Sequence, residues 1–229
     1  MSSPEKNFPQ RIRSFIRRQG RLTQGQQHAL DNLWDKYCLD PLSETDFIQV
    51  FGRNAPLVVE IGFGNGESLA EMAAANPDTD YLGIEVHRPG VGHLLMLLEQ
   101  QGISNVRIYC YDAIEIIGRK IADNSLAGVH LFFPDPWPKK KHHKRRIVRP
   151  DFVELIVRKL KKGGYFHAAT DWENYAQAML AVLSESSALK NSSATNDYCE
   201  RPEYRPLTKF ERRGMRLGHG VWDLIFIKQ

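Results

Sequence analysis

The chain has 229 residues, of which 42% are hydrophobic, and a formal net charge of +4; this length suits a single folded domain. No apolar run approaches the ~20 residues of a membrane span, and the polar, basic start lacks the apolar segment of a secretory signal, so we expect a cytoplasmic protein. The three widely spaced cysteines, Cys38, Cys110 and Cys199, fit neither a disulfide framework nor a zinc site, and we expect no metal.

Helices and strands are predicted to alternate along the chain. Residues 1–22 are expected to form a flexible basic arm, and residues 23–229 one domain that opens with a helix over 23–39, which Thr23 could cap. From residue 57 short apolar runs alternate with amphipathic segments, which predicts an α/β fold with a mostly parallel sheet covered by helices on both faces. We expect strands over 57–61, 81–86, 106–111, 128–133 and 165–169, helices over 67–76, 88–101, a short stretch ending near 121, 149–162 and 172–183, a loop over 184–200, and a closing antiparallel strand over 221–227 after a hairpin through Gly218 and Gly220.

An acidic residue stands at or near the carboxyl end of five predicted strands. Those ends meet at one edge of a parallel sheet, where α/β proteins bind ligands. Carboxylates gathered there would repel one another unless a cation, or the hydroxyl and amino groups of a ligand, compensated them. The alternative is that they cap the following helices, as Asp112 or Asp171 could do. The five acids are Glu60, Glu85, Asp112, Asp135 and Asp171.

The turn after the first strand, residues 62–66, reads GFGNG, and its glycines would let the backbone approach a ligand closely. Glu67 stands where a dinucleotide-binding fingerprint has its third glycine, and the turn lacks the Lys and Ser/Thr of a phosphate-binding P-loop. Glu85 is placed to accept hydrogen bonds from both ribose hydroxyls of a nucleoside, and Asp112 could meet an adenine amino group. The pattern favours an adenosine that carries positive charge and no phosphate, which describes S-adenosyl-L-methionine.

Residues 134–146 read PDPWPKKKHHKRR and place one carboxylate beside a strip of positive charge. Asp135 follows an apolar strand, and two prolines stiffen the backbone around it. Seven Lys or Arg then occur over residues 139–149 with no acid among them. A fixed carboxylate beside a cationic strip suggests chemistry on a polyanion, whereas the plain alternative is a solvated basic loop. Trp137 could stack on a base or, equally, pin the loop against the core.

Basic residues concentrate in three segments, residues 6–21, 139–149 and 201–216. These hold 19 of the 31 Lys and Arg and only two of the 27 acids, so the rest of the chain is net acidic. We therefore expect an anionic partner that contacts the protein at several places. Nucleic acid fits better than a membrane, because the segments show little of the helical apolar periodicity of an interfacial anchor.

These motifs together resemble the bacterial tRNA (guanine-N7)-methyltransferases, from about Gly20 to the C-terminus. The long Pro-Asp-Pro-Trp motif with its basic tail is not a general feature of class I methyltransferases, and neither is Thr-Lys-Phe-Glu. The resemblance implies the seven-stranded class I methyltransferase sheet and transfer of a methyl group from S-adenosyl-L-methionine to N7 of guanine 46 in the variable loop of tRNA. Lys141 departs from the arginine expected in many relatives. The residues that carry the resemblance are 62–66, Glu85, 132–146, 169–171 and 208–212.

The resemblance also implies roles for individual residues. Asp135 is its active-site residue and tRNA its partner, and we expect a monomer. Asp171 could instead cap a helix, and Glu211 could form a salt bridge with Arg212 or Arg213. The resemblance puts cofactor contacts at Glu60, Gly62, Gly64, Glu85, Asp112 and Asp135, substrate contacts at Lys139, Asp171, Thr208, Lys209, Phe210 and Glu211, and RNA contacts at Lys141, His142, His143, Lys144, Arg145 and Arg146.

Two other interpretations stay open on the sequence. One is a non-catalytic RNA-binding protein that keeps an old cofactor fold, although binding phosphate alone would not select five acids. The other is a methyltransferase for a protein or a small molecule, which the basic segments disfavour. For the guanine reaction no general base is needed, because N7 is a neutral acceptor with a free lone pair. Asp135 is then expected to orient the base and to favour the positive charge that develops on it.

Overall fold

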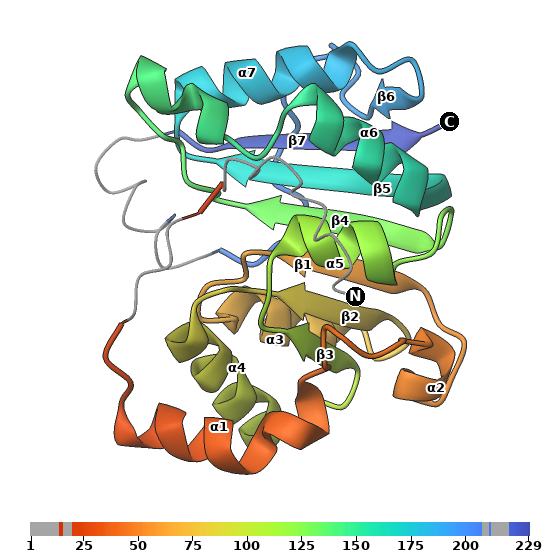
Figure 1. Cartoon of the computed structure of the whole chain (residues 1–229). Coiled ribbons are helices and arrows are strands. Elements are labelled where there is room, and N and C mark those ends of the chain that lie inside the picture. Colours follow the sequence, from red (N-terminus) through yellow and green to blue (C-terminus); the bar gives the residue numbers. More distant parts are fainter. Residues whose placement is uncertain (1–13, 16–19, 208–210, 212–219) are drawn as a thin grey trace, which may run out of the picture.

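A seven-stranded sheet forms the centre of the protein in the computed structural model, which describes residues 14–15, 20–207, 211 and 220–229 (Figure 1). The strand order is β3-β2-β1-β4-β5-β7-β6. Strands β1 to β5 are parallel, and β7 runs antiparallel to both β5 and β6. The strands are β1 (Leu57–Ile61), β2 (Asp80–Ile84), β3 (Val106–Tyr109), β4 (Leu126–Phe132), β5 (Leu160–Thr170), β6 (Leu189–Asn191) and β7 (Trp222–Lys228).

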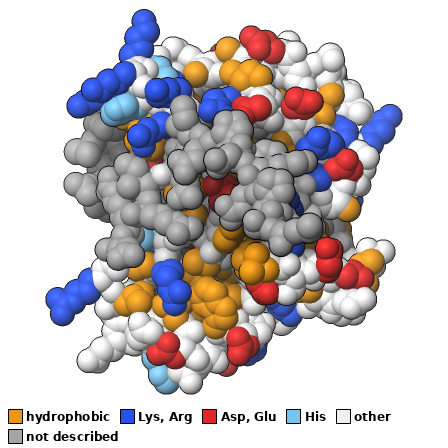
Figure 2. All heavy atoms as spheres, in the orientation of Figure 1, with side chains coloured by type: hydrophobic (Ala, Val, Ile, Leu, Met, Phe, Trp, Pro, Cys, Tyr) orange, Lys and Arg blue, Asp and Glu red, His pale blue; other side chains and the backbone are white. Residues whose placement is uncertain are grey.

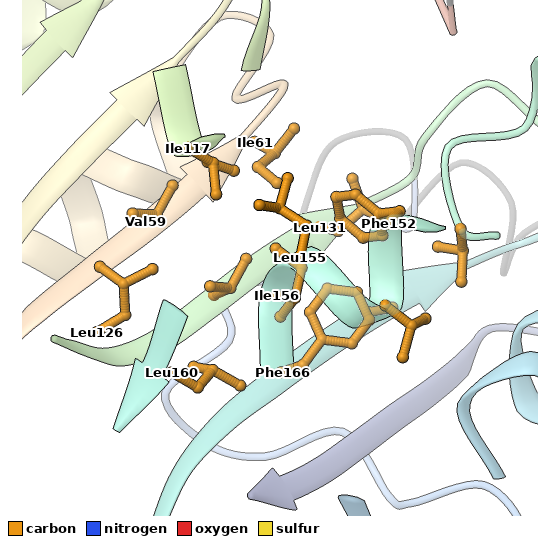
Figure 3. Packing of buried hydrophobic residues seen from close by; sticks show 14 of the residues in the cluster. Val59, Ile61, Ile117, Leu126, Leu131, Phe152, Leu155, Ile156, Leu160 and Phe166 are labelled. Carbon is orange, nitrogen blue, oxygen red and sulfur yellow. The ribbon is translucent and has the colours of Figure 1, made fainter. Parts of the chain in front are cut away.

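Helices cover both faces of the sheet (Figure 1). On one face α4 packs against α1 and α3, and on the other α6 packs against α5 and α7. Figure 3 shows part of the larger apolar cluster, in which Val59, Leu131 and Phe166 from the sheet meet Ile117 and Ile156 from the helices. The helices are α1 (Gln24–Tyr37), α2 (Phe47–Phe51), α3 (Glu67–Ala75), α4 (Arg88–Gln101), α5 (Ala113–Lys120), the 3₁₀ helix η1 (Lys140–Arg145), α6 (Pro150–Lys159) and α7 (Glu173–Ser184).

Local signals explain where several helices begin and end. Thr23 caps α1 as predicted: its hydroxyl accepts a hydrogen bond from the backbone N–H of Gln26 (3.2 Å), and the Gln26 side chain accepts one from the N–H of Thr23 (2.9 Å). Pro150 occupies the first turn of α6, where its missing N–H costs nothing. Gly102 ends α4 with a left-handed φ of 66°. The predicted antiparallel direction of the last strand is confirmed.

The fold differs from the prediction in several elements. Helix α2 was not predicted, η1 lies in the predicted basic loop, and β6 lies inside the stretch 184–200 that we expected to be a loop. Helix α6 ends at Lys159 instead of residue 162, because the next residues open β5 and turn through Gly163, whose φ is 76°. Gly218 of the predicted hairpin lies outside the described residues.

The parallel strands all end at one edge of the sheet, on the left in Figure 1, so the loops that follow them converge there. On the face opposite α6 and α7, part of the C-terminal segment lies against β4 and β5. Tyr204 stacks on His130 of β4 and hydrogen-bonds His167 of β5 (2.8 Å). Within the described residues, no helix combines the length and the apolar character needed to cross a membrane.

Candidate active site

A partly open cavity of about 230 Å³ lies at the carboxyl ends of β1 to β4. Four of the residues predicted for the site line it: Gly62, Glu85, Asp112 and Asp135. Apolar side chains from the strand ends, among them Ile84 and Leu131, form much of the rest of the wall. The cavity therefore joins carboxylates to an apolar surface, which suits a ligand that is part ring and part polar.

The Gly-rich turn after β1 shapes one wall of the cavity. Gly62 and Gly64 have φ values of 72° and 60°, in the left-handed region that side-chain-bearing residues rarely adopt. No other atom lies within 4 Å of the position that a Cβ would take at either glycine. The two glycines are therefore needed for their backbone conformation and not for lack of space. At Gly90 of α4 space is the constraint, because a Cβ there would lie only 2.0 Å from the Gly64 carbonyl oxygen.

Glu85 follows β2 and ties two loops of the cavity together. Its Oε2 accepts a hydrogen bond from the N–H of Gly64 (3.0 Å), and its Oε1 accepts from the N–H groups of Val86 (2.6 Å) and His87 (3.0 Å). Each carboxylate oxygen can accept more than one hydrogen bond. Glu85 can thus hold the Gly-rich turn and still receive the hydroxyls of a ligand.

Asp112 caps a helix and also lines the cavity, so the two interpretations that the sequence left open are compatible. Its Oδ1 accepts a hydrogen bond from the N–H of Ile114 (2.9 Å) and caps α5, and the same residue lines the cavity. Asp171 differs. The residue before α7 is Trp172, which makes no side-chain cap, and Thr170 Oγ1 accepts the N–H of Trp172 (3.2 Å). The alternative that Asp171 caps this helix is therefore wrong.

Glu60 does not line the cavity, although we predicted it at the rim. It pairs in register with His130 of the neighbouring strand, and its side chain is buried, with Oε2 lacking any hydrogen-bond partner among the described residues. Burial, with the nearby charge of Glu85, raises the pKa of the Glu60 carboxyl to about 8. A buried acceptor of this kind is suited to a cationic group placed near the turn.

Replacing Glu60 with glutamine is expected to raise the stability of the ligand-free protein, compared with the wild type, more at pH 8 than at pH 5. The raised pKa means that, between the ordinary value of 4.5 and about 8, the folded protein keeps a proton that the unfolded chain releases. The free energy of unfolding of the wild-type protein therefore falls as pH rises through this window. Glutamine does not titrate, so Glu60→Gln removes that loss. Thermal unfolding of both proteins at the two pH values measures it; equal shifts at both would contradict the raised pKa.

Asp135 sits in a backbone segment under unusual constraint. The residues two before and two after it, Phe133 and Trp137, have left-handed φ values of 50° and 47°, and prolines stand on either side of it. The N–H of Phe133 donates to the carbonyl of Ala169 (2.8 Å), which anchors the segment to β5. Such strained conformations persist only where the surroundings hold them. The exposed Asp135 side chain is thus presented at the cavity mouth by a stiff support.

The basic run after Asp135 forms η1, with Lys139 as its exposed N-cap. Figure 2 shows Lys, Arg and His side chains gathered at the upper left of this view. The Arg145 guanidinium lies 4.9 Å from the centre of the Trp137 ring, the His142 ring meets that ring edge-on, and the Trp137 Nε1 donates to the Ser14 carbonyl (3.2 Å). Trp137 therefore contacts η1 and Ser14, and it belongs to neither of the two apolar core clusters, so these contacts do not pin the loop against the core.

Arg146 has a different role from its neighbours, and its burial is inconsistent with the predicted RNA contact. It is buried, and its guanidinium donates to the carbonyl of Pro136 (2.9 Å) and to the side chain of Asn174 (2.8 Å). It also lies 4.7 Å from the ring centre of Tyr175. Arg146 therefore ties the Asp135 loop to α7 and is not available to a phosphate. Lys140, Lys141 and Lys144, in contrast, are exposed.

The C-terminal substrate stretch is only partly visible, because Thr208, Lys209 and Phe210 lie outside the described residues. Glu211 is buried and forms a two-bond ion pair with Arg205 (2.7 and 2.8 Å); the alternative partners Arg212 and Arg213 also lie outside the description. Sequence reasoning missed Arg205, and it missed Ser14 and Phe15, which line the cavity. The only sequence signal for these residues is that Ser14 and Phe15 lie in the basic segment 6–21 and Arg205 lies in the basic segment 201–216.

Comparisons with known proteins agree with this geometry. Residues 54–224 match the family model described as "Putative methyltransferase". The tRNA (guanine-N(7)-)-methyltransferase of Alcanivorax borkumensis is 58% identical over 220 residues (96% of this chain, 92% of the relative), and that of Klebsiella pneumoniae is 59% identical over 220 residues (94% and 91%). The chain belongs to the tRNA (guanine-N(7)-)-methyltransferase family. Membership in this family confirms the resemblance seen in the sequence.

Solved structures place the family's fold among the class I methyltransferases. The 16S rRNA methyltransferase KamB superimposes with a TM-score of 0.59 at 16% identity (82% of this chain, 95% of that chain). The aminoglycoside resistance methyltransferase NpmB1 gives a TM-score of 0.55 at 13% identity (82% and 95%). These likenesses confirm the predicted seven-stranded fold. Among the described residues, no group of three or more His, Cys, Asp or Glu is arranged to hold a metal ion.

Proposed function

We propose that this protein transfers the methyl group of S-adenosyl-L-methionine to N7 of a guanine in tRNA, at position 46 of the variable loop. The observation that carries the proposal is the placement of Asp135, which stands at the mouth of the cavity and is followed closely by the cationic helix η1. The carboxylate-lined cavity suits the donor, and the cationic helix suits a nucleic acid. Relatives that are 58–59% identical to this chain are named tRNA (guanine-N(7)-)-methyltransferase, which supports N7 of a tRNA guanine as the acceptor.

The residues of the cavity fit the proposed donor. Gly62 and Gly64 give the ligand an open backbone turn, and Glu85 and Asp112 offer acceptors for ribose hydroxyls and the adenine amino group. The raised pKa of the buried Glu60 carboxyl, whose Oε2 has no partner among the described residues, keeps it protonated at neutral pH in the ligand-free protein, and a cationic ligand nearby would favour its ionised form. When bound, the donor supplies an electrophilic methyl group on a sulfonium.

The remaining steps fall to the protein side chains and to the guanine. The N7 lone pair forms the new N–C bond as the C–S bond breaks. The two electrons of the C–S bond stay on sulfur, and the positive charge passes to the guanine ring. No proton leaves N7, so no general base is needed. The Asp135 carboxylate favours the developing charge and orients the ring, and most of the remaining acceleration comes from holding N7 in line with the methyl group.

We assign the remaining contacts by surface position. Lys139, the N-cap of η1, and Asp171, which directly follows β5, are both exposed. They are proposed to contact the target nucleotide together with Thr208, Lys209 and Phe210. Lys140, Lys141, Lys144 and Arg145, with His142 and His143, form the proposed phosphate-binding strip. Because its substrate is tRNA, we further propose a cytoplasmic enzyme that acts as a monomer, which light scattering after size-exclusion chromatography would test.

The experiment that tests the function is methyl transfer in vitro. Purified protein with a donor radiolabelled on its methyl group is expected to label total tRNA, and cleavage at N7-methylguanine should map the label to position 46. The non-catalytic RNA-binding alternative predicts tRNA binding without label. A labelled protein or small molecule in place of tRNA would favour the third interpretation.

Substitution of Gly90 by alanine is expected to weaken donor binding by about tenfold or more. The added Cβ would meet the backbone oxygen of Gly64 at 2.0 Å, so the Gly-rich turn must shift, and overpacking of this kind costs about 1–3 kcal/mol. Calorimetric titration with S-adenosylhomocysteine measures the loss. Gly118→Ala is the matched control, since open space surrounds that helical glycine; an unchanged affinity in Gly90→Ala would contradict the proposed contact surface.

A further inference from the structure

A cluster of buried charged side chains, Arg205, Glu211 and Asp223, lies beside the sheet. The Arg205 side chain is 1% exposed, and its guanidinium forms two forked ion pairs at once. Nε and Nη2 donate to the two oxygens of Asp223 in β7 (2.7 and 2.8 Å), and Nη1 and Nη2 donate to the two oxygens of Glu211 (2.7 and 2.8 Å). A buried charge is tolerated only with such partners.

The anchor of this cluster in the sheet is well defined. Asp223 Oδ1 also meets His167 Nε2 of β5 at 2.7 Å, and His167 Nδ1 meets the Tyr204 hydroxyl at 2.8 Å. Burial lowers the pKa of His167, so the neutral ring donates from Nε2 and accepts at Nδ1. The cluster is therefore hydrogen-bonded to two adjacent strands, which fixes the position of Arg205.

Two functional segments meet at this fixed cation. Arg205 and Glu211 bracket residues 206–210, so their ion pair joins the two ends of the stretch that carries Thr208, Lys209 and Phe210. The same guanidinium lies 5.9 Å from the ring centre of Phe132 and 5.7 Å from that of Phe133. These are the last residues before Pro134 and Asp135, and Phe133 has the left-handed φ of 50°.

We propose that Arg205 is a positioning residue for methyl transfer, which fixes Glu211 and β7 beside the segment that presents Asp135, and that Glu211 acts through Arg205 and does not contact the guanine. The inference deepens the proposed function and rests on it. Arg205 and Glu211 are only 1% and 4% exposed, too deeply buried to contact RNA, and both oxygens of Glu211 accept hydrogen bonds from Arg205. Lysine cannot replace arginine here, because an ammonium lacks the planar fork that both carboxylates use.

A double-mutant cycle on Arg205→Lys and Glu211→Gln tests the proposal. We express kcat/KM for tRNA per functional donor-binding site. Each single variant is expected to lower this value by about tenfold or more and to leave the affinity for S-adenosylhomocysteine unchanged. If Glu211 acts through Arg205, the double variant is no worse than the poorer single variant by more than about twofold. Losses that multiply, or wild-type kcat/KM in Arg205→Lys, would overturn the proposal.

Lys159→Arg is the matched control, because like Arg205→Lys it changes the shape of a buried cationic head group at constant charge. Lys159 is buried at the opposite edge of the sheet, where its Nζ donates to Asp123 Oδ1 (2.7 Å) and to the Ile121 carbonyl (2.6 Å). This variant should lose stability but keep kcat/KM per donor-binding site. Titration with S-adenosylhomocysteine counts the folded molecules that can bind the donor, so unfolded molecules do not enter the comparison. If the wild-type protein fails to label tRNA, the proposed function is refuted before the cycle is begun.

A measurement without substrate decides the case if Arg205→Lys does not fold. In Glu211→Gln the remaining Arg205–Asp223 pair stays balanced in charge, so the fold should survive. Hydrogen exchange of the Phe133 amide, bonded to Ala169, is expected to accelerate in this variant, while the Ser125 amide, bonded to Lys159 at the far edge, should not change. Unchanged exchange at Phe133 would mean that Glu211 does not hold the segment, and the proposal would fall.

Discussion

Replacing Asp135 with alanine is expected to lower the rate of methyl transfer to tRNA by about 10²- to 10³-fold or more, while the affinity for tRNA changes by no more than a few-fold. The carboxylate is the charged group that the stiff Phe133–Trp137 segment holds at the cavity mouth. Its removal takes away the charge that favours a methylated, positively charged guanine, but it leaves the exposed lysines of η1 in place. Single-turnover transfer of a radiolabelled methyl group, with filter binding of tRNA, measures both quantities.

Two further variants make that result specific. Asp135→Asn keeps the size of the side chain and removes its charge, so it should be nearly as inactive as the alanine variant if the charge matters. Asp46→Ala removes a carboxylate that caps α2 by accepting the N–H of Ile48 (2.9 Å), which should cost about 1 kcal/mol of stability and no turnover. Near-wild-type transfer by Asp135→Ala would defeat the role assigned to Asp135.

Changing Lys140, Lys141 and Lys144 together to alanine is expected to weaken tRNA binding strongly and to flatten its dependence on salt. All three side chains are exposed on or beside η1. Each phosphate contact that is lost removes about 0.7–0.9 from the slope of log K against log salt concentration, so the slope should fall by about 2. Binding isotherms at several salt concentrations give the slope, and the methylation rate at saturating tRNA should change much less than the affinity.

The control for this experiment removes charge from another part of the surface. Lys161 and Lys162 are exposed at the start of β5, at the edge opposite the cavity. Their double alanine variant changes the net charge by nearly as much, but it should leave the slope of salt dependence as it is in the wild type. If both sets of substitutions flattened the slope equally, binding would depend on net charge alone, and η1 would not be the RNA contact.

Much of the architecture follows from patterns local in the sequence. The apolar runs and their spacing predicted the parallel strands and the helices between them, because burial of one face or both has a short period along the chain. Thr23 could be recognised as a cap because its partner Gln26 is only three residues away. Glu85, Asp112 and Asp135 could be predicted to share one edge because parallel strands end on the same side.

Other properties of the site depend on partners far away in the sequence. Arg146 is one basic residue in a run of similar ones, and only its hydrogen bond to Asn174, 28 residues away, separates it from the exposed lysines. Ser14 reaches the cavity through its bond to Trp137, 123 residues away. Glu211 could not be assigned to Arg205 without β7, because Asp223, 18 residues beyond Arg205, holds the guanidinium in place.

The sequence by itself determined the class of fold and the edge of the sheet at which the cavity lies, and it predicted Asp135 as the candidate catalytic carboxylate and an anionic partner. Tertiary structure alone decided which charges are free and which are structural: Glu60 is buried beside the cavity and not on its wall, Arg146 is bound within the protein, and Glu211 is paired with Arg205. The physical reason is that burial and pairing set the energy of a charge, and both depend on segments brought together only when the chain folds.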